Sequence, residues 1–240
     1  MESQKSLFTR RRDHEAKEHQ TIIFKDMVEK DRDDTADDCK TFRIEVVLKN
    51  FEASSEDHME DVDLAYFIGA YEELNKFIGL LGKIFHFVQA DIREKTNKLL
   101  HLREKHPESY RSVKTMVSFE NEQQHYPGSK ALLCLHRALE FIVSFIGALA
   151  ESNNDDSVSS MCRKCYEDTL SRFHNWLIRK SVSLASYTLP SRGQLIASIQ
   201  GNMPEEDYVR GVLSNVVVKT QTVYSRVDRI YSEYDLHSLM

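Results

Sequence analysis

The stretch LAYFIGAYEELNKFIGLLGKIFHFV, residues 64–88, decides the fold class of this chain. Its apolar residues recur at intervals of three and four, which is the period of a helix with one buried face. These residues are Leu64, Phe67, Ile68, Tyr71, Leu74, Phe77, Ile78, Leu81, Phe85 and Val88. We therefore predict a long amphipathic helix over residues 64–88.

The rest of the chain also favours helices. Only 8 Gly and 4 Pro in 240 residues leave few turns, which fits long helices better than many short strands. A helix from about Val158 is expected to bury Tyr166, Leu170, Phe173 and Leu177. Breaks are predicted at residues 126–128, 153–157, 188–191 and 201–204, with Ser191 as the N-cap of the next helix. We expect an all-α fold of about eight helices in one domain, residues 42–240.

Residues 1–41 differ from this domain in composition. They are dense in both charge signs and contain few large apolar residues, so they cannot bury enough surface to offset the entropy of ordering. We predict a disordered, charged N-terminal extension. Its Arg10–Arg12 triplet suits a localisation or lipid-contact patch, or simply a solvated charge cluster.

Charge and composition exclude several classes of protein. A net charge of −6 and a pI near 5.9 disfavour a nucleic-acid-binding protein and binding to anionic membranes by bulk charge. The N-terminus lacks the apolar segment of a signal peptide, so the four cysteines are expected to be reduced thiols in the cytoplasm. The longest apolar run, Ala131–Leu149, is interrupted by His136, Arg137 and Glu140, and we interpret it as a central buried helix.

Asp91 and Lys95 are four residues apart on a predicted helix, which places them on one face within contact distance. A surface ion pair is the simplest interpretation. Lys98 lies near the same face, whereas Arg93 points away.

Lys130, Cys134 and Arg137 share one face of the most apolar helix. A charge in such a helix should be paired or lie at a cavity, because an unpaired buried charge costs several kcal/mol. Arg137 also fits a structural arginine paired with a distant carboxylate, and Lys130 also fits an exposed residue at the helix start.

The case for an enzyme is weak. His174 suits a general base, a metal ligand, a hydrogen-bond donor or an ordinary core histidine, but no HExxH, serine elbow or Gly-rich phosphate loop accompanies it. The CxxC of Cys162 and Cys165 resembles half a zinc site or a redox pair, yet the remaining ligands and the strand-to-helix context are missing. We expect no catalytic residue, no metal and no cofactor.

Taken together, residues 42–240 resemble the glycolipid transfer protein superfamily, and most of all its branch that transfers ceramide 1-phosphate. The matching stretches occur in family order: FRIEVVL (42–48), DIREK (91–95), LHRAL (135–139), FHNW (173–176), TLP (188–190) and YSE (231–233). The resemblance implies a two-layer helical sandwich with an apolar lipid cavity. It also implies non-vesicular transfer of a sphingolipid between membranes, without any chemical change.

The resemblance implies roles for the polar residues as well. Asp91 would accept hydrogen bonds from the sphingolipid amide and a nearby hydroxyl, and His174 would donate to the amide carbonyl. Lys95 matches the phosphate-binding branch, and Lys130 replaces an arginine of that branch. Cys134 matches neither branch, because phosphate binders have a second Arg there and sugar binders have a stacking Trp.

Lys95 and Lys130, with Arg93 or Lys98 as a further cation, favour ceramide 1-phosphate as the cargo. A neutral glycosphingolipid, a sphingolipid sensor, a ligand-free helical scaffold and an unrecognised hydrolase remain alternatives. The hydrolase has no nucleophile and base that can be named.

The family pattern also predicts where lipid chains and membranes meet the protein. The apolar cavity would be lined by residues such as Phe85, Phe141, Phe145, Val182 and Leu213. Trp176, Arg179 and Lys180 suit reversible docking at a membrane surface, although Trp176 also fits an ordinary core position. Arg137 is expected at the rim of the site. We expect a cytoplasmic monomer that contacts membranes transiently.

Overall fold

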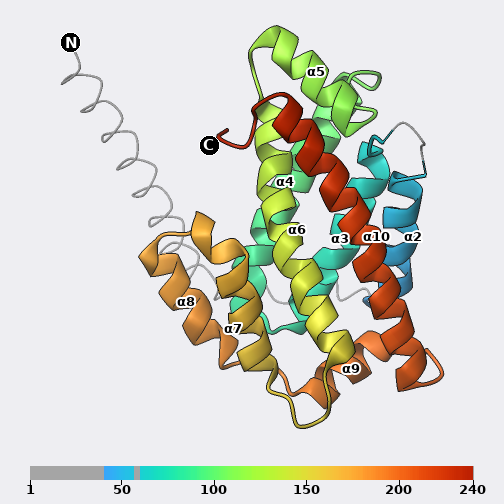
Figure 1. Cartoon of the computed structure of the whole chain (residues 1–240), viewed down its shortest axis with the longest axis vertical. Coiled ribbons are helices and arrows are strands. Elements are labelled where there is room, and N and C mark those ends of the chain that lie inside the picture. The colour runs from blue at the N-terminus through green and yellow to red at the C-terminus, as the bar shows by residue number, and fades with distance from the viewer. Residues whose placement is uncertain (1–40, 57–59, 240) are drawn as a thin grey trace. The chain divides into compact units, whose positions relative to one another are not determined.

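The computed structural model describes residues 41–56 and 60–239. Within these ranges the chain forms nine α-helices and two short 3-10 helices, with no strand (Figure 1). They are α2 (Ile44–Ser54), α3 (Leu64–Leu80), η1 (Lys83–Phe85), α4 (His86–Lys105), α5 (Val113–Gln123), α6 (Pro127–Glu151), α7 (Val158–Asp168), η2 (Leu170–Phe173), α8 (Trp176–Ser186), α9 (Arg192–Gln200) and α10 (Glu206–Glu233). The prediction of an all-α fold is confirmed. The predicted disordered extension, residues 1–41, lies outside the described residues except for its last one.

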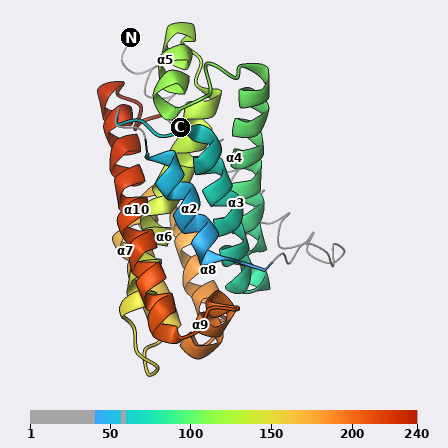
Figure 2. The same ribbon diagram turned by 90° about the vertical axis from the view of Figure 1, so that its right-hand side faces the viewer.

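The helices form a closed circuit of neighbours around the core. α6 packs against α10, α10 against α2, α2 against α3, α3 against α4, and α4 returns to α6. In side view, α2, α3 and α4 lie on one side, and α6 and α10 lie on the other (Figure 2). This is the two-layer sandwich that the family resemblance implies. α7 packs against α6, and α8 packs against α7.

Short polar side chains define where several helices begin. Asp63 accepts hydrogen bonds from the backbone N–H groups of Ala65 and Tyr66 at the start of α3. The predicted N-cap Ser191 is confirmed, because its side chain accepts from the backbone N–H of Gln194. Such caps satisfy N–H groups that have no partner inside the helix.

The single helix predicted over residues 64–88 is wrong in one respect. Gly82 has φ 111°, a left-handed conformation that favours glycine, and it separates α3 from η1 and α4. Leu81 and Phe85, on either side of this break, are both buried. The apolar spacing therefore continues through the break and does not reveal it. The turn sends the chain back along α3, so that α4 packs beside it.

The single helix predicted from Val158 through Leu177 is also wrong. α7 ends at Asp168, and η2 separates it from α8. Tyr166 is buried as predicted, but Leu170 and Phe173 are only half-buried, and Leu177 is exposed. Because α8 starts anew at Trp176, the helical phase extrapolated from α7 does not apply to it.

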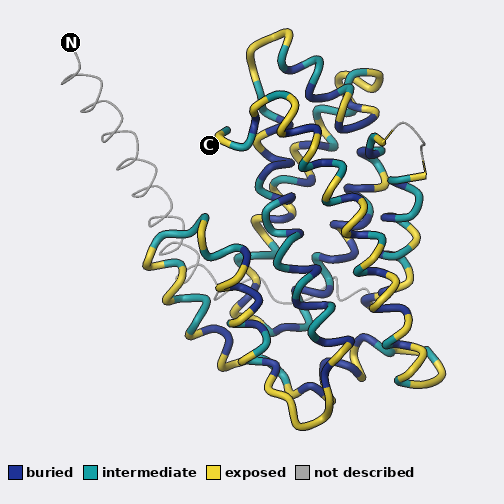
Figure 3. The backbone as a smooth tube through the Cα atoms, viewed as in Figure 1, coloured by how far each residue is buried: buried dark blue, intermediate teal, exposed yellow. Residues whose placement is uncertain are grey.

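α6 is the central helix of the fold. By length and composition it could cross a membrane, but 56% of its most apolar 18-residue stretch is buried inside the protein. It contacts α4, α5, α7 and α10, and buried residues follow its length (Figure 3). The prediction that this apolar run is a buried core helix is confirmed.

Candidate functional site

Asp91 and Lys95 form the ion pair that their spacing predicts on α4. Lys95 Nζ donates to Asp91 Oδ1 at 2.5 Å, and the side chain of Lys95 is 19% exposed while that of Asp91 is 59% exposed. Burial alone would lower the pKa of Lys95, but the hydrogen bond and charge of Asp91, with the charge of Glu94, raise it above its usual value. Lys95 therefore stays cationic at neutral pH.

Cys134 on α6 lies close to this pair. Burial raises the pKa of its thiol, while the positive charges of Lys95 and Arg137 oppose that shift. The thiol is therefore neutral at physiological pH, flanked by two cations. Lys130 is exposed one turn earlier on the same helix face.

Arg137 is held by partners that the sequence did not predict. Its Nη2 donates to the backbone carbonyl of His237 at 2.6 Å, and its guanidinium lies 4.2 Å from the ring centroid of Phe173. Arg172 covers the same ring at 4.8 Å and pairs with Glu140. Among the described residues no carboxylate pairs with Arg137, so its structural contacts are to a backbone carbonyl and an aromatic ring. Arg137 instead ties the C-terminal segment to α6.

His174 reaches the same neighbourhood from the linker between η2 and α8. Its Nδ1 lies 2.7 Å from the hydroxyl of Tyr166. Burial lowers the pKa of the imidazole, and the negative charge of Asp91 acts in the opposite direction. The fold thus brings His174 within electrostatic reach of Asp91, although the two lie far apart in the sequence.

The remaining predicted headgroup residues are exposed on α4. Lys98 continues the stripe of Asp91 and Lys95, because positions three and seven residues apart share a helix face. Arg93 lies two residues from Asp91 and therefore points to a different side. By helical position, Lys98 shares the face of the Asp91–Lys95 pair and Arg93 does not.

Four of the five residues predicted to line an apolar cavity belong to the core or pack against it. Phe85, Phe145 and Leu213 are buried, and Phe141 and Val182 are half-buried. The rings of Phe141 and Phe145 stack with centroids 5.8 Å apart.

The outer face of α8 is apolar and exposed. Trp176 is 65% exposed, and Lys180 Nζ lies 6.0 Å from its ring centroid. Leu184 and Tyr187 are 69% and 67% exposed, and neither was predicted to belong to the docking surface. Their positions, 8 and 11 residues after Trp176, place them on the same helical face. The alternative of Trp176 as a core residue is wrong.

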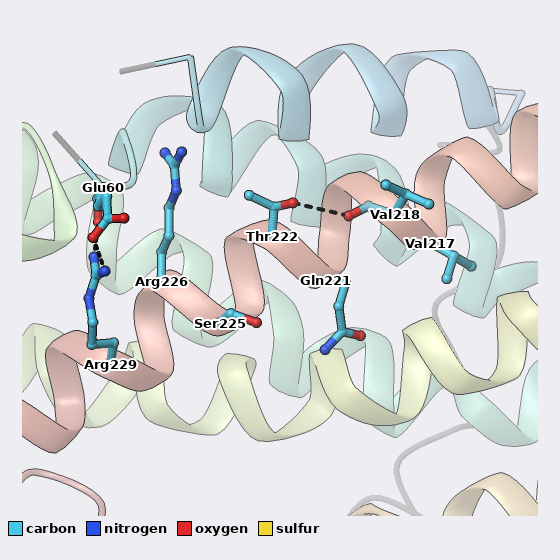
Figure 4. Close-up of a pocket in the computed structure, with 8 residues that line it drawn as sticks. All are labelled: Glu60, Val217, Val218, Gln221, Thr222, Ser225, Arg226 and Arg229. Atoms are coloured by element: carbon cyan, nitrogen blue, oxygen red, sulfur yellow. Dashed lines mark hydrogen bonds and ion pairs between the residues drawn. The ribbon is translucent and has the colours of Figure 1, made fainter. Parts of the chain in front are cut away.

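A surface cleft of about 380 Å³ lies between α7, η2 and α8. Tyr166, Trp176, Arg179 and Lys180 are among the residues that line it. A larger groove of about 640 Å³ follows α10 and contains none of the predicted site residues (Figure 4). In that groove Arg229 pairs with Glu60. We place the candidate site at the Asp91–Lys95 ion pair, Cys134 and His174, because electrostatic interactions link these predicted residues. Tyr166, which contacts His174, also lines the smaller cleft.

The CxxC pair belongs to the core of α7. Cys162 and Cys165 are buried free thiols, and burial raises the pKa of Cys162 to about 12. A thiol that remains protonated is a poor metal ligand and a poor nucleophile. Among the described residues, no group of three or more His, Cys, Asp or Glu side chains could hold a metal ion.

Three comparisons show what the chain is similar to. The family model for glycolipid transfer protein matches residues 62–201. Human ceramide-1-phosphate transfer protein is 31% identical over 215 residues, covering 85% of this chain and 99% of the human protein. The crystal structure of that human protein in complex with 2:0 ceramide-1-phosphate superposes with a TM-score of 0.77 at 30% identity, covering 84% of this chain and all of the other.

A lipid-free relative gives the same result. The apo crystal structure of mouse ceramide-1-phosphate transfer protein superposes with a TM-score of 0.78 at 27% identity, covering 83% of this chain and 100% of the mouse chain. The sequence match, the shared fold and the family model together establish that this chain belongs to the glycolipid transfer protein family.

Proposed function

We propose that this protein transfers a sphingolipid between membranes and that its favoured cargo is ceramide 1-phosphate. The lipid is carried without any change in its covalent bonds, so the protein acts as a carrier and not as an enzyme. Family membership supports the carrier function. The human relative, which is 31% identical, is named for this cargo.

The observation that carries the proposal is that the negative charge of Asp91 acts on the buried imidazole of His174. A carboxylate accepts hydrogen bonds, and a neutral imidazole donates one. Burial lowers the pKa of His174, which keeps its ring neutral at pH 7 despite the nearby charge of Asp91. The pair is suited to a sphingolipid amide, whose N–H would meet Asp91 while its carbonyl would meet His174.

The surrounding charges favour a phosphate headgroup. Lys95 is cationic, half-buried and next to Asp91, and exposed Lys130 lies on the neighbouring α6. Cys134 offers no aromatic face on which a sugar ring could stack. Two cations without a stacking platform fit an anionic headgroup better than a neutral sugar.

The energetic need for a carrier follows from the hydrophobic effect. Each methylene exposed to water costs about 0.8 kcal/mol, so a two-chain lipid leaves a bilayer very slowly without help. The ring of Phe141 stacks on that of Phe145 and packs against Tyr166, the partner of His174. We propose that lipid chains enter by separating these and neighbouring core side chains.

The exposed face of α8 supports a peripheral docking role. Trp176 and Leu184 provide apolar surface, and exposed Arg179 and Lys180 can meet lipid phosphates. We propose that a cytoplasmic monomer docks through this face, takes up one lipid and leaves. The three free cysteines of the described chain fit a reducing compartment.

Transfer between vesicles tests the proposal. Donor vesicles would contain fluorescent ceramide 1-phosphate or fluorescent galactosylceramide, and the protein would be offered each lipid in parallel. Preferential transfer of the phosphate lipid is the expected result. Preferential transfer of the sugar lipid would replace the proposed cargo, and transfer of neither would indicate a sensor or a scaffold.

A further inference from the structure

The hydroxyl of Tyr166 contacts Nδ1 of His174. Under the proposed function, the lipid carbonyl would bind the other ring nitrogen, Nε2. We propose that Tyr166 is a positioning residue, whose hydroxyl donates to His174 Nδ1 and so fixes the ring proton on Nε2. In that tautomer Nε2 is a hydrogen-bond donor. The inference rests on the proposed function of His174 and deepens it.

The geometry of Tyr166 suits this role. Its oxygen lies 2.7 Å from His174 Nδ1, which is a normal hydrogen-bond distance. The side chain is buried in the last turn of α7, and Phe141 of α6 packs edge-on against its ring at 6.4 Å between centroids. A ring enclosed in this way cannot turn its hydroxyl elsewhere without displacing its neighbours.

The backbone around His174 is fixed on both sides. The N–H of His174 donates to the carbonyl of Ser171 at 3.1 Å. The next residue, Asn175, caps α8 by accepting a hydrogen bond from the N–H of Ile178 at 3.0 Å. The imidazole therefore projects from an anchored linker.

Two arrangements of that proton are compatible with a 2.7 Å contact. If Tyr166 donates, Nδ1 accepts and Nε2 carries the proton. If Nδ1 donates, Nε2 has only a lone pair and would repel a lipid carbonyl. Only the first arrangement prepares the imidazole to bind that carbonyl.

The environment favours the first arrangement. Burial raises the pKa of Tyr166 to about 12, so its hydroxyl remains protonated and able to donate. Among the described residues, His174 Nδ1 is the hydrogen-bond partner of that hydroxyl. The second ring nitrogen, Nε2, has no hydrogen-bond partner within the described part of the chain and is available to a ligand.

The direct test is the tautomer of His174 in the lipid-free protein, measured by the ¹⁵N chemical shifts of its ring nitrogens. The signals would be assigned by their loss in His174→Gln. Wild type is expected to show a protonated Nε2 and an unprotonated Nδ1. Tyr166→Phe is expected to show both tautomers. A protonated Nδ1 in wild type, or unchanged tautomers in Tyr166→Phe, would overturn the proposal.

Tyr234→Phe is the matched control. It also removes a tyrosine hydroxyl, one that lies 2.8 Å from Ser118 Oγ, but it should leave the His174 signals unchanged. In the transfer assay, Tyr166→Phe is expected to slow lipid transfer roughly 3- to 10-fold, as expected for one lost hydrogen bond. Since the NMR measurement needs no lipid, it can fail or succeed independently of the proposed function.

Discussion

Lys95 Nζ and Asp91 Oδ1 lie 2.5 Å apart across one turn of α4. The cation suited to a lipid phosphate is therefore also the partner of the carboxylate suited to the lipid amide. This contact couples headgroup recognition to amide recognition. A change at either residue should disturb both.

Replacing Lys95 with Ala should slow transfer of ceramide 1-phosphate about 10-fold or more, because a hydrogen bond to a charged group contributes about 1.5–3 kcal/mol. Lys164→Ala is the matched control, since Lys164 also pairs with a carboxylate four residues away, Asp168, at 2.9 Å. Vesicle transfer rates of both variants provide the measurement. Equal rates for the two variants would remove Lys95 from the headgroup site.

Cys134→Arg should increase selectivity for ceramide 1-phosphate over galactosylceramide about 5- to 10-fold, because a guanidinium adds charge and a bidentate donor. The control Cys134→Ser keeps a small neutral side chain and should leave the ratio of the two transfer rates near that of wild type. An unchanged ratio in Cys134→Arg would mean that the lipid headgroup does not reach this position.

Trp176→Ala should weaken binding to vesicles about 10-fold or more, because a large aromatic side chain is lost from the docking face. Tyr208→Ala is the control, since Tyr208 is 49% exposed on α10, away from α8. Cosedimentation with vesicles measures both variants, and circular dichroism shows that they remain folded. If the two variants lose binding equally, α8 is not the docking face.

His136 should make the protein less stable in acid. It is buried, its ring stacks 4.2 Å from that of Tyr224, and burial lowers its pKa from 6.5 to about 4 although Asp228 opposes this. Between these values the unfolded chain binds a proton that the folded chain does not. The free energy of unfolding therefore falls as pH decreases from 6.5 toward 4.

Urea unfolding at pH 7 and pH 5 measures this loss. We expect His136 to contribute roughly 1 to 2 kcal/mol of it, so His136→Gln should lose less stability between these two pH values than wild type. The control His101→Gln changes an exposed histidine and should follow wild type. An equal loss of unfolding free energy in His136→Gln and wild type would contradict the lowered pKa of His136.

The sequence predicts local features of this protein well. The four-residue spacing of Asp91 and Lys95 is sufficient to place both on one helix face. The position of Ser191 at a predicted break identifies it as the N-cap of the next helix. The break at Gly82 is hidden, because apolar residues on both sides of it stay buried and preserve the helical period.

Contacts between distant segments are less accessible to sequence analysis. The hydrogen bond of Tyr166 to His174 depends on how η2 turns the chain between α7 and α8, which no local pattern specifies. The same turn resets the helical phase and exposes Leu177 and Leu184. The partner of Arg137 is the backbone carbonyl of His237. Every residue has such a carbonyl, so the sequence does not identify this partner.

The most direct test of the account is the binding of ceramide 1-phosphate to Asp91→Val, compared with Asp168→Val. Both substitutions remove an exposed carboxylate from an i, i+4 ion pair, but of the two only Asp91 has a charge that shifts the pKa of His174. We predict that Asp91→Val loses about 10-fold or more in affinity, while Asp168→Val binds like wild type. Wild-type affinity in a folded Asp91→Val protein would contradict the proposed recognition of the sphingolipid amide.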